Sequence, residues 1–145
     1  REEEMASDLN KYVIFKLIDE YYGLDIENVI SVEKMQEFTR VPNAPSYVRG
    51  VINLRGEVIP VIDLREKLGL KLKSTDENTR IIIVSESEIN LGIVVDSSSE
   101  VLEIQRSLID KPLASEEESN NYLKGIGKVD GRLIIIIDLE KLIEA

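Results

Sequence analysis

The stretch GVINLRGEVIPVIDL, residues 50–64, occurs a second time in altered form as GIGKVDGRLIIIIDL, residues 125–139. Each copy begins with Gly, has a second Gly six positions later, and continues into a run rich in β-branched residues that closes on Asp-Leu. Six of the fifteen aligned positions are identical. A repeat of this kind indicates that one structural unit is used twice, which decides the fold more firmly than any local motif.

The repeat extends toward the N-terminus of each copy. YYGLDI at 21–26 aligns with NLGIVV at 90–95, and an apolar stretch precedes each of them, YVIFKLI at 12–18 and RIIIVSE at 80–86. Short apolar segments separated by Gly-containing turns predict small barrels or a sandwich. Because the pattern occurs twice, we expect two small barrels packed side by side.

Composition limits the classes of protein to consider. The 145 residues include no Cys, 43% are hydrophobic, and the formal net charge is −10. The absence of Cys excludes disulfides and thiolate chemistry. A strongly acidic chain disfavours nucleic acid or an anionic membrane as partner, since both rely on cationic protein surface. No apolar run is long enough to span a bilayer, so we expect a soluble intracellular protein.

The chain lacks the residues that most catalytic arrangements require. The chain has no His, no P-loop and no complete GxGxxG, which excludes the common triads, His-ligated metals and the usual nucleotide loops. A carboxylate-dependent hydrolase stays formally open, with four candidate acids: Asp25, Asp63, Asp96 and Asp138. The simpler interpretation of Asp63 and Asp138 is that each caps the N-terminus of a short helix after its strand. Asp25 and Asp96 fall near strand ends, where turn formation or solvation would explain them.

The two copies differ at the turn. Copy one has Asn53 and Arg55 where copy two has Lys128 and Asp130. Backbone geometry explains the glycines of both turns but not the arginine. Arg55 is either an exposed residue paired with a carboxylate or part of an interface, for which its several directional donors suit it.

Four stretches together resemble the CheW family of bacterial chemotaxis adaptors: YGLDIENVISV, VPNAPSYVRGVINLRGEVIPVIDLREKLG, LGIVVDSSSEVLEI and YLKGIGKVDGRLIIIIDLEKL. The GVxNLRGxxxPxxDL pattern carries most of this resemblance. It implies a mostly β fold of two five-stranded SH3-like barrels side by side, with short helices and a C-terminal helix. We expect one domain over 11–145, with subdomains near 19–72 and 80–137 that exchange terminal segments, after a flexible leader at 1–10.

The resemblance also implies a function. The protein would be a non-enzymatic adaptor linking chemoreceptors to the histidine kinase CheA, without catalytic residues, metal or cofactor. Its place would be the cytoplasm, at membrane-associated receptor arrays, without insertion into the membrane. An alternative within the family is a CheW-like module of a longer protein, either the regulatory domain of CheA or a CheV-type protein.

Site residues follow from the resemblance position by position. Receptor contacts or support for them would come from seven residues: Val29, Val32, Asn53, Arg55, Gly92, Val94 and Val95. Contacts to the kinase would lie near Val41 and Pro42. The SSSE segment at 97–100 is more polar than the family pattern leads us to expect at this strand turn.

Overall fold

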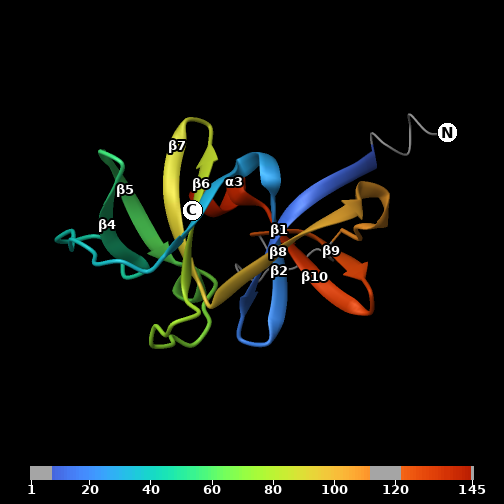
Figure 1. Cartoon of the computed structure of the whole chain (residues 1–145), viewed down its shortest axis with the longest axis horizontal. Coiled ribbons are helices and arrows are strands. Elements are labelled where there is room, and N and C mark those ends of the chain that lie inside the picture. The colour runs from blue at the N-terminus through green and yellow to red at the C-terminus, as the bar shows by residue number, and fades with distance from the viewer. Residues whose placement is uncertain (1–7, 112–121, 145) are drawn as a thin grey trace. The chain divides into compact units, whose positions relative to one another are not determined.

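The computed structural model describes residues 8–111 and 122–144, which form mainly β-strands joined by short turns (Figure 1). The elements in chain order are β1 (Leu9–Leu17), β2 (Glu20–Asp25), the 3-10 helix η1 (Ile26–Asn28), β3 (Val29–Lys34), β4 (Val48–Leu54), β5 (Glu57–Asp63), α2 (Leu64–Lys67), β6 (Arg80–Glu86), β7 (Ile89–Val95), β8 (Ser97–Gln105), the 3-10 helix η2 (Arg106–Leu108), β9 (Leu123–Val129), β10 (Arg132–Ile137) and α3 (Leu139–Glu144). Residues 1–7 of the expected leader lie outside the described part. Leu9 and Asn10 belong to β1, so the expectation of a leader is wrong for these two residues.

The strands form two five-stranded sheets. One has the order β8-β1-β2-β10-β9 and the other β3-β6-β7-β5-β4. Their contacts divide the chain into unit 1, which combines residues 1–27 with 99–145, and unit 2, residues 28–98. When the strands are matched by the repeat, both sheets have the same order, so the duplication inferred from the sequence is present in the strand pairing.

Each sheet joins segments from both copies of the repeat. In unit 1 the early strand β2 pairs in parallel with the late strand β10, as Figure 1 shows where blue and red strands meet. In unit 2 the corresponding parallel pair is β7 with β5. The expected subdomains 19–72 and 80–137 therefore do not coincide with the units, because the hairpin β9–β10 pairs with β2 and the hairpin β4–β5 pairs with β7.

The mostly β class with five strands in each half is confirmed. Among the described residues, however, each sheet is open: the first and last strands of each order are not paired with one another. The expected SH3-like barrels are thus not closed by hydrogen bonds. Bends at bulges, such as the register shift between Val48 and Gly50, curve a sheet without closing it.

Two mainly aliphatic cores stabilise the units. The core of unit 2 consists of Ile52, Ile59, Val61, Ile81, Ile83 and Val94, and that of unit 1 of Tyr12, Ile14, Ile104, Ile134 and Ile136. Complete burial of one such side chain contributes about 1.5–3 kcal/mol. Unit 1 differs in using aromatic packing, since the ring of Phe15 stacks on Tyr22 with centroids 5.6 Å apart.

Two of the repeated glycines allow a close crossing of the backbone. A Cβ on Gly50 would lie 2.5 Å from the carbonyl oxygen of Thr39, which pairs with Val51. A Cβ on Gly125 would meet Asp110 and Ile109 in the same way, and Asp110 pairs with Ile126. The first Gly of each copy is therefore required by the same close approach in both units.

The predicted helix caps are confirmed. Asp63 Oδ1 accepts a hydrogen bond from the Glu66 amide at the start of α2, at 3.4 Å. Asp138 Oδ1 accepts one from the Lys141 amide at the start of α3, at 3.2 Å. Gly69, with a φ of +76°, ends the turn after α2.

Candidate functional site

Strand β3 has two of its three apolar residues on the exposed face. Ile30 is 54% exposed and Val32 is 42% exposed, whereas the polar residues Ser31 and Glu33, which alternate with them, are half-buried. β3 is also the first strand of its sheet and pairs with β6 on one side only. A strand that turns aliphatic side chains outward at a sheet edge offers a surface for another protein.

The other side of β3 carries the half-buried Val29, Ser31 and Glu33. A register shift between Val29 and Ser31 interrupts the pairing with β6. The Ser31 hydroxyl is buried and has no hydrogen-bond partner among the described residues. Glu33 has a side chain only 19% exposed and faces the turn between β4 and β5.

That turn holds Arg55 in a left-handed backbone conformation. The φ angles of Arg55 and Gly56 are +52° and +86°, as in a type I′ hairpin turn. The amide of Gly56 donates to Asn53 Oδ1 at 3.0 Å, which explains the predicted residue Asn53 as support for the turn. For a residue other than Gly, Asn or Asp this conformation costs roughly 1–2 kcal/mol.

An ion pair connects the turn to β3. Arg55 Nη2 lies 3.6 Å from Glu33 Oε2, while 71% of the arginine side chain remains exposed. Such a pair contributes little to stability, about 0–1 kcal/mol, and leaves most of the guanidinium available to a partner. Glu33 is the residue that sequence reasoning missed.

Three of the predicted receptor residues are interior. Gly92 is buried, and a Cβ on it would lie 3.0 Å from the side chains of Val61 and Ile81. Val94 belongs to the core of unit 2, and Val95 is 1% exposed. Packing within the unit accounts for these positions. By contrast, Val32 and Arg55 are exposed, and Val29 is half-buried.

The predicted kinase residues lie in a separate hollow of unit 2. Val41 and Pro42 line a concave region of about 850 Å³ formed by the loop at 37–49. Its wall includes Arg49, whose Nη1 donates to Asp63 Oδ2 at 3.0 Å and whose guanidinium lies 5.3 Å from the ring centre of Phe38. The hollow thus combines apolar residues with a fixed cation.

Each of the four candidate acids of the hydrolase alternative has a structural partner. Asp25 and Asp138 belong to unit 1, where they accept hydrogen bonds from Asn10 and from the Lys141 amide. Asp63 and Asp96 line one small cavity of about 10 Å³ in unit 2, which has no room for a substrate. Each of these two carboxylates also forms an ion pair with an arginine, Asp63 with Arg49 and Asp96 with Arg65.

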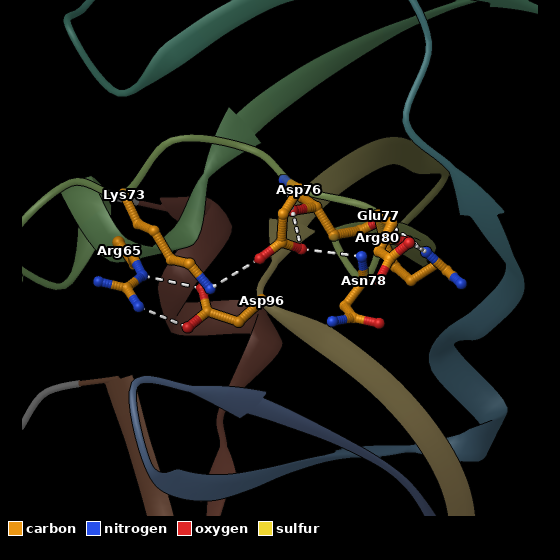
Figure 2. A network of polar contacts seen from close by, with 8 residues as sticks. Arg65, Lys73, Asp76, Glu77, Asn78, Arg80 and Asp96 are labelled. Atoms are coloured by element: carbon orange, nitrogen blue, oxygen red, sulfur yellow. Dashed lines mark hydrogen bonds and ion pairs between the residues drawn. The ribbon is translucent and has the colours of Figure 1, made fainter.

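Arg65 binds Asp96 through two of its nitrogens, as Figure 2 shows. Arg65 Nε donates to Asp96 Oδ1 at 2.8 Å, and Nη2 donates to Oδ2 at 2.5 Å. These hydrogen bonds raise the pKa of Arg65 above its ordinary value, against the opposing effect of burial. Within 8–111 and 122–144, no cluster of three or more His, Cys, Asp or Glu residues could hold a metal ion.

No helix in the described ranges has the length and apolar character needed to cross a membrane.

Comparisons with known proteins identify one family along nearly the whole chain. The model of the CheW-like domain matches residues 11–145. The chain is 38% identical over 136 residues to the chemotaxis protein CheW of Klebsiella aerogenes, covering 93% of this chain and 82% of that protein. It is 34% identical over 142 residues to CheW of Helicobacter pylori, covering 98% and 86%.

A solved structure is similar along nearly the whole chain. The crystal structure of the scaffolding protein TtCheW from Thermoanaerobacter tengcongensis superposes with a TM-score of 0.88 and 39% sequence identity. The alignment covers 94% of this chain and 93% of that one.

Proposed function

The chain belongs to the CheW family, and from this premise we propose that it is a non-enzymatic adaptor linking chemoreceptors to the histidine kinase CheA. The observation that carries the proposal is the exposed aliphatic face of β3 beside Arg55. A protein that must hold partners without chemistry needs exposed contact surfaces, and unit 2 provides two of them. Its place would be the cytoplasm, at receptor arrays.

The first surface is the proposed receptor site. Ile30 and Val32 supply apolar area, and Arg55 supplies directional donors beside them. An amphipathic helix from a receptor tip would bury the aliphatic side chains and pair a polar group with the guanidinium. Val29 lies half-buried on the same strand and Asn53 holds the turn through the Gly56 amide, and the proposal does not depend on the buried Gly92, Val94 or Val95.

The second surface is the hollow at 37–49, which we assign to the kinase. Val41 is 43% exposed there beside Pro42, and the two belong to a loop that leads into β4. Because the hollow and the β3 face consist of different residues, an adaptor could hold both partners at the same time.

Chemical-shift mapping of the labelled chain tests the proposal. A receptor-tip fragment should shift the amides of β3 and the Arg55 turn, and the regulatory domain of CheA should then shift those of 37–49. The two proteins together should give a ternary complex. Failure to bind either partner would refute the adaptor role, whereas binding of both at one shared surface would refute only the division of surfaces.

A further inference from the structure

We propose that the small cavity at the ends of β5 and β7 is a binding site for one water molecule, which donates hydrogen bonds to the carboxylates of Asp63 and Asp96. The cavity has a volume of about 10 Å³, and seven of the nine residues that line it have polar or charged side chains. A polar cavity of this size holds about one water molecule, whereas cavities that stay dry are apolar. The size and the polarity of the cavity therefore fit the same occupant.

The strand register brings the two carboxylates to the same edge of the sheet. β5 and β7 are parallel neighbours, and their pairing places Asp63, the last residue of β5, opposite Val94. Asp96 directly follows β7, two positions after Val94. The pKa of Arg65 is raised mainly by its hydrogen bonds to Asp96 and also by the charge of Asp63, so Asp63 lies close to this pair. The two carboxylates have side chains only 6% and 12% exposed, and buried charges of this kind require hydrogen-bond donors.

The charges around the cavity are already balanced, which favours a neutral occupant. Each of the two carboxylates has an arginine of its own. Lys73, the lysine of the wall, has its Nζ 3.2 Å from Asp76 Oδ2 (Figure 2). A metal ion would therefore meet no uncompensated negative charge, and an anion would meet two carboxylates. Water is neutral and has two O–H donors, and each carboxylate oxygen can accept more than one hydrogen bond.

The remaining wall is the loop at 73–75, which is held on both sides of the cavity. Before it, the carbonyl oxygen of Lys71 accepts a hydrogen bond from Arg65 Nη1 at 2.8 Å. After it, Thr79 is 5% exposed, and its hydroxyl oxygen accepts a hydrogen bond from the Asp76 amide at 2.9 Å. A water molecule behind this loop leaves only when the loop opens, so its residence time should reach the timescale of loop motion.

The corresponding place in unit 1 has a different charge. The residue of α3 that the repeat aligns with Arg65 is Glu140, which is exposed. A carboxylate cannot bind another carboxylate as an arginine does, so the bridged arrangement is specific to unit 2. Since Asp63 also binds Arg49 of the hollow at 37–49, the water belongs to the support of that hollow, whichever partners the chain binds.

A high-resolution crystal structure of the intact chain tests the site. Density for one water molecule should lie about 2.5–3.0 Å from a carboxylate oxygen of Asp63 and from one of Asp96. Absence of this density would overturn the proposal. Crystals soaked in rubidium chloride should show no anomalous peak in the cavity, and a peak there would overturn the neutral occupant in favour of a cation.

A variant gives the second readout. Val95→Ile adds one methyl group to a residue that lines the cavity, so the water should be lost. The matched control is Val101→Ile, at an exposed valine outside the cavity, which should keep it. In solution, water-selective NOE spectra should show a long-lived water beside the amides that line the cavity in the unaltered protein and the control, but not in Val95→Ile. A water kept in Val95→Ile, or lost in both variants, would overturn the assignment to this cavity.

Discussion

Units 1 and 2 have the same strand order but different surfaces. Both use a Gly at the close backbone crossing, a two-residue hairpin turn with positive φ, and an Asp helix cap where the second strand of that hairpin ends. The turn of unit 2 carries Arg55 and that of unit 1 carries Asp130, with the same φ of +52°. The left-handed conformation is thus a property of the repeat, and only the side chain on it is specific to one unit.

The difference extends to the edge strands. β3 of unit 2 exposes two aliphatic residues and pairs its interior Glu33 with the turn arginine. The edge strand β8 of unit 1 pairs Glu100 with Arg132 instead. Shared residues therefore maintain the fold in both units, and residues that differ determine what each unit presents to other molecules.

The largest expected effect concerns the shared glycines. Gly50→Ala and Gly125→Ala each force a Cβ against the crossing backbone, and each should lower the free energy of unfolding by about 3 kcal/mol. Gly56→Ala is the control: its Cβ meets nothing within 4 Å, so only its positive φ, about 1 kcal/mol, opposes the change. Chemical denaturation measures all three. If only one of Gly50→Ala and Gly125→Ala were strongly destabilising, the two glycines would not play the same structural role in the two units.

Removing the two helix caps should lower the free energy of unfolding by different amounts. Asp138→Ala removes one cap and should cost about 1 kcal/mol in unfolding free energy. Asp63→Ala removes a cap and also leaves Arg49 without its carboxylate, so we expect about 2 kcal/mol. Thermal unfolding of both variants decides this. Equal costs would show that the Arg49 pair adds nothing to unit 2.

Alkaline pH should destabilise unit 1 through Tyr22. Burial, with help from Glu20, raises the pKa of Tyr22 from 10.0 to about 12. Between these two values the unfolded chain loses the phenolic proton while the folded chain keeps it, so folding stability falls as pH rises, and below about pH 10 the group contributes no pH dependence. Tyr22→Phe keeps the stacking on Phe15 and should show a smaller decline in unfolding free energy from pH 10 to 12. The same decline in both proteins would contradict the assignment.

The smallest expected effect is a gain in folding stability. Arg55→Asn places a residue suited to a type I′ turn in the strained position and should stabilise the protein by about 0.5–1 kcal/mol. Asp130→Asn, at a position that already tolerates the conformation, should change stability by only a few tenths of a kcal/mol. Denaturation midpoints compare the two. A loss of stability in Arg55→Asn would mean that the contact with Glu33 outweighs the backbone strain.

The sequence alone predicted much of this fold. The repeat predicted the strands, both helix caps and the duplicated unit, because glycines, β-branched runs and cap residues act locally. The ranges of the units were not predictable in the same way. Whether β10 pairs with β2 or with the nearer β7 depends on long-range packing, and the apolar strands are compatible with either partner.

The site was less predictable for a physical reason. Strand periodicity assigns alternate residues to two faces but does not say which face is inside, and in β3 the apolar face is outside. Glu33 was missed because a charged residue in an alternating strand is expected to point into solvent, whereas its side chain is only 19% exposed. Val94 was assigned to a surface for the converse reason, since an entirely apolar strand gives no indication of its exposed side.

The most direct test of the account compares two valines that the repeat aligns, one in each unit. Val32 on β3 is 42% exposed and Val101 on β8 is 50% exposed, so a glutamate should be tolerated by the fold at both positions. We would measure the affinity of a receptor-tip fragment for each variant by calorimetry. The account predicts at least a tenfold loss for Val32→Glu and less than a twofold change for Val101→Glu. Equal losses, or a loss for Val101→Glu alone, would contradict the claim that the units share a fold and that unit 2 binds the receptor.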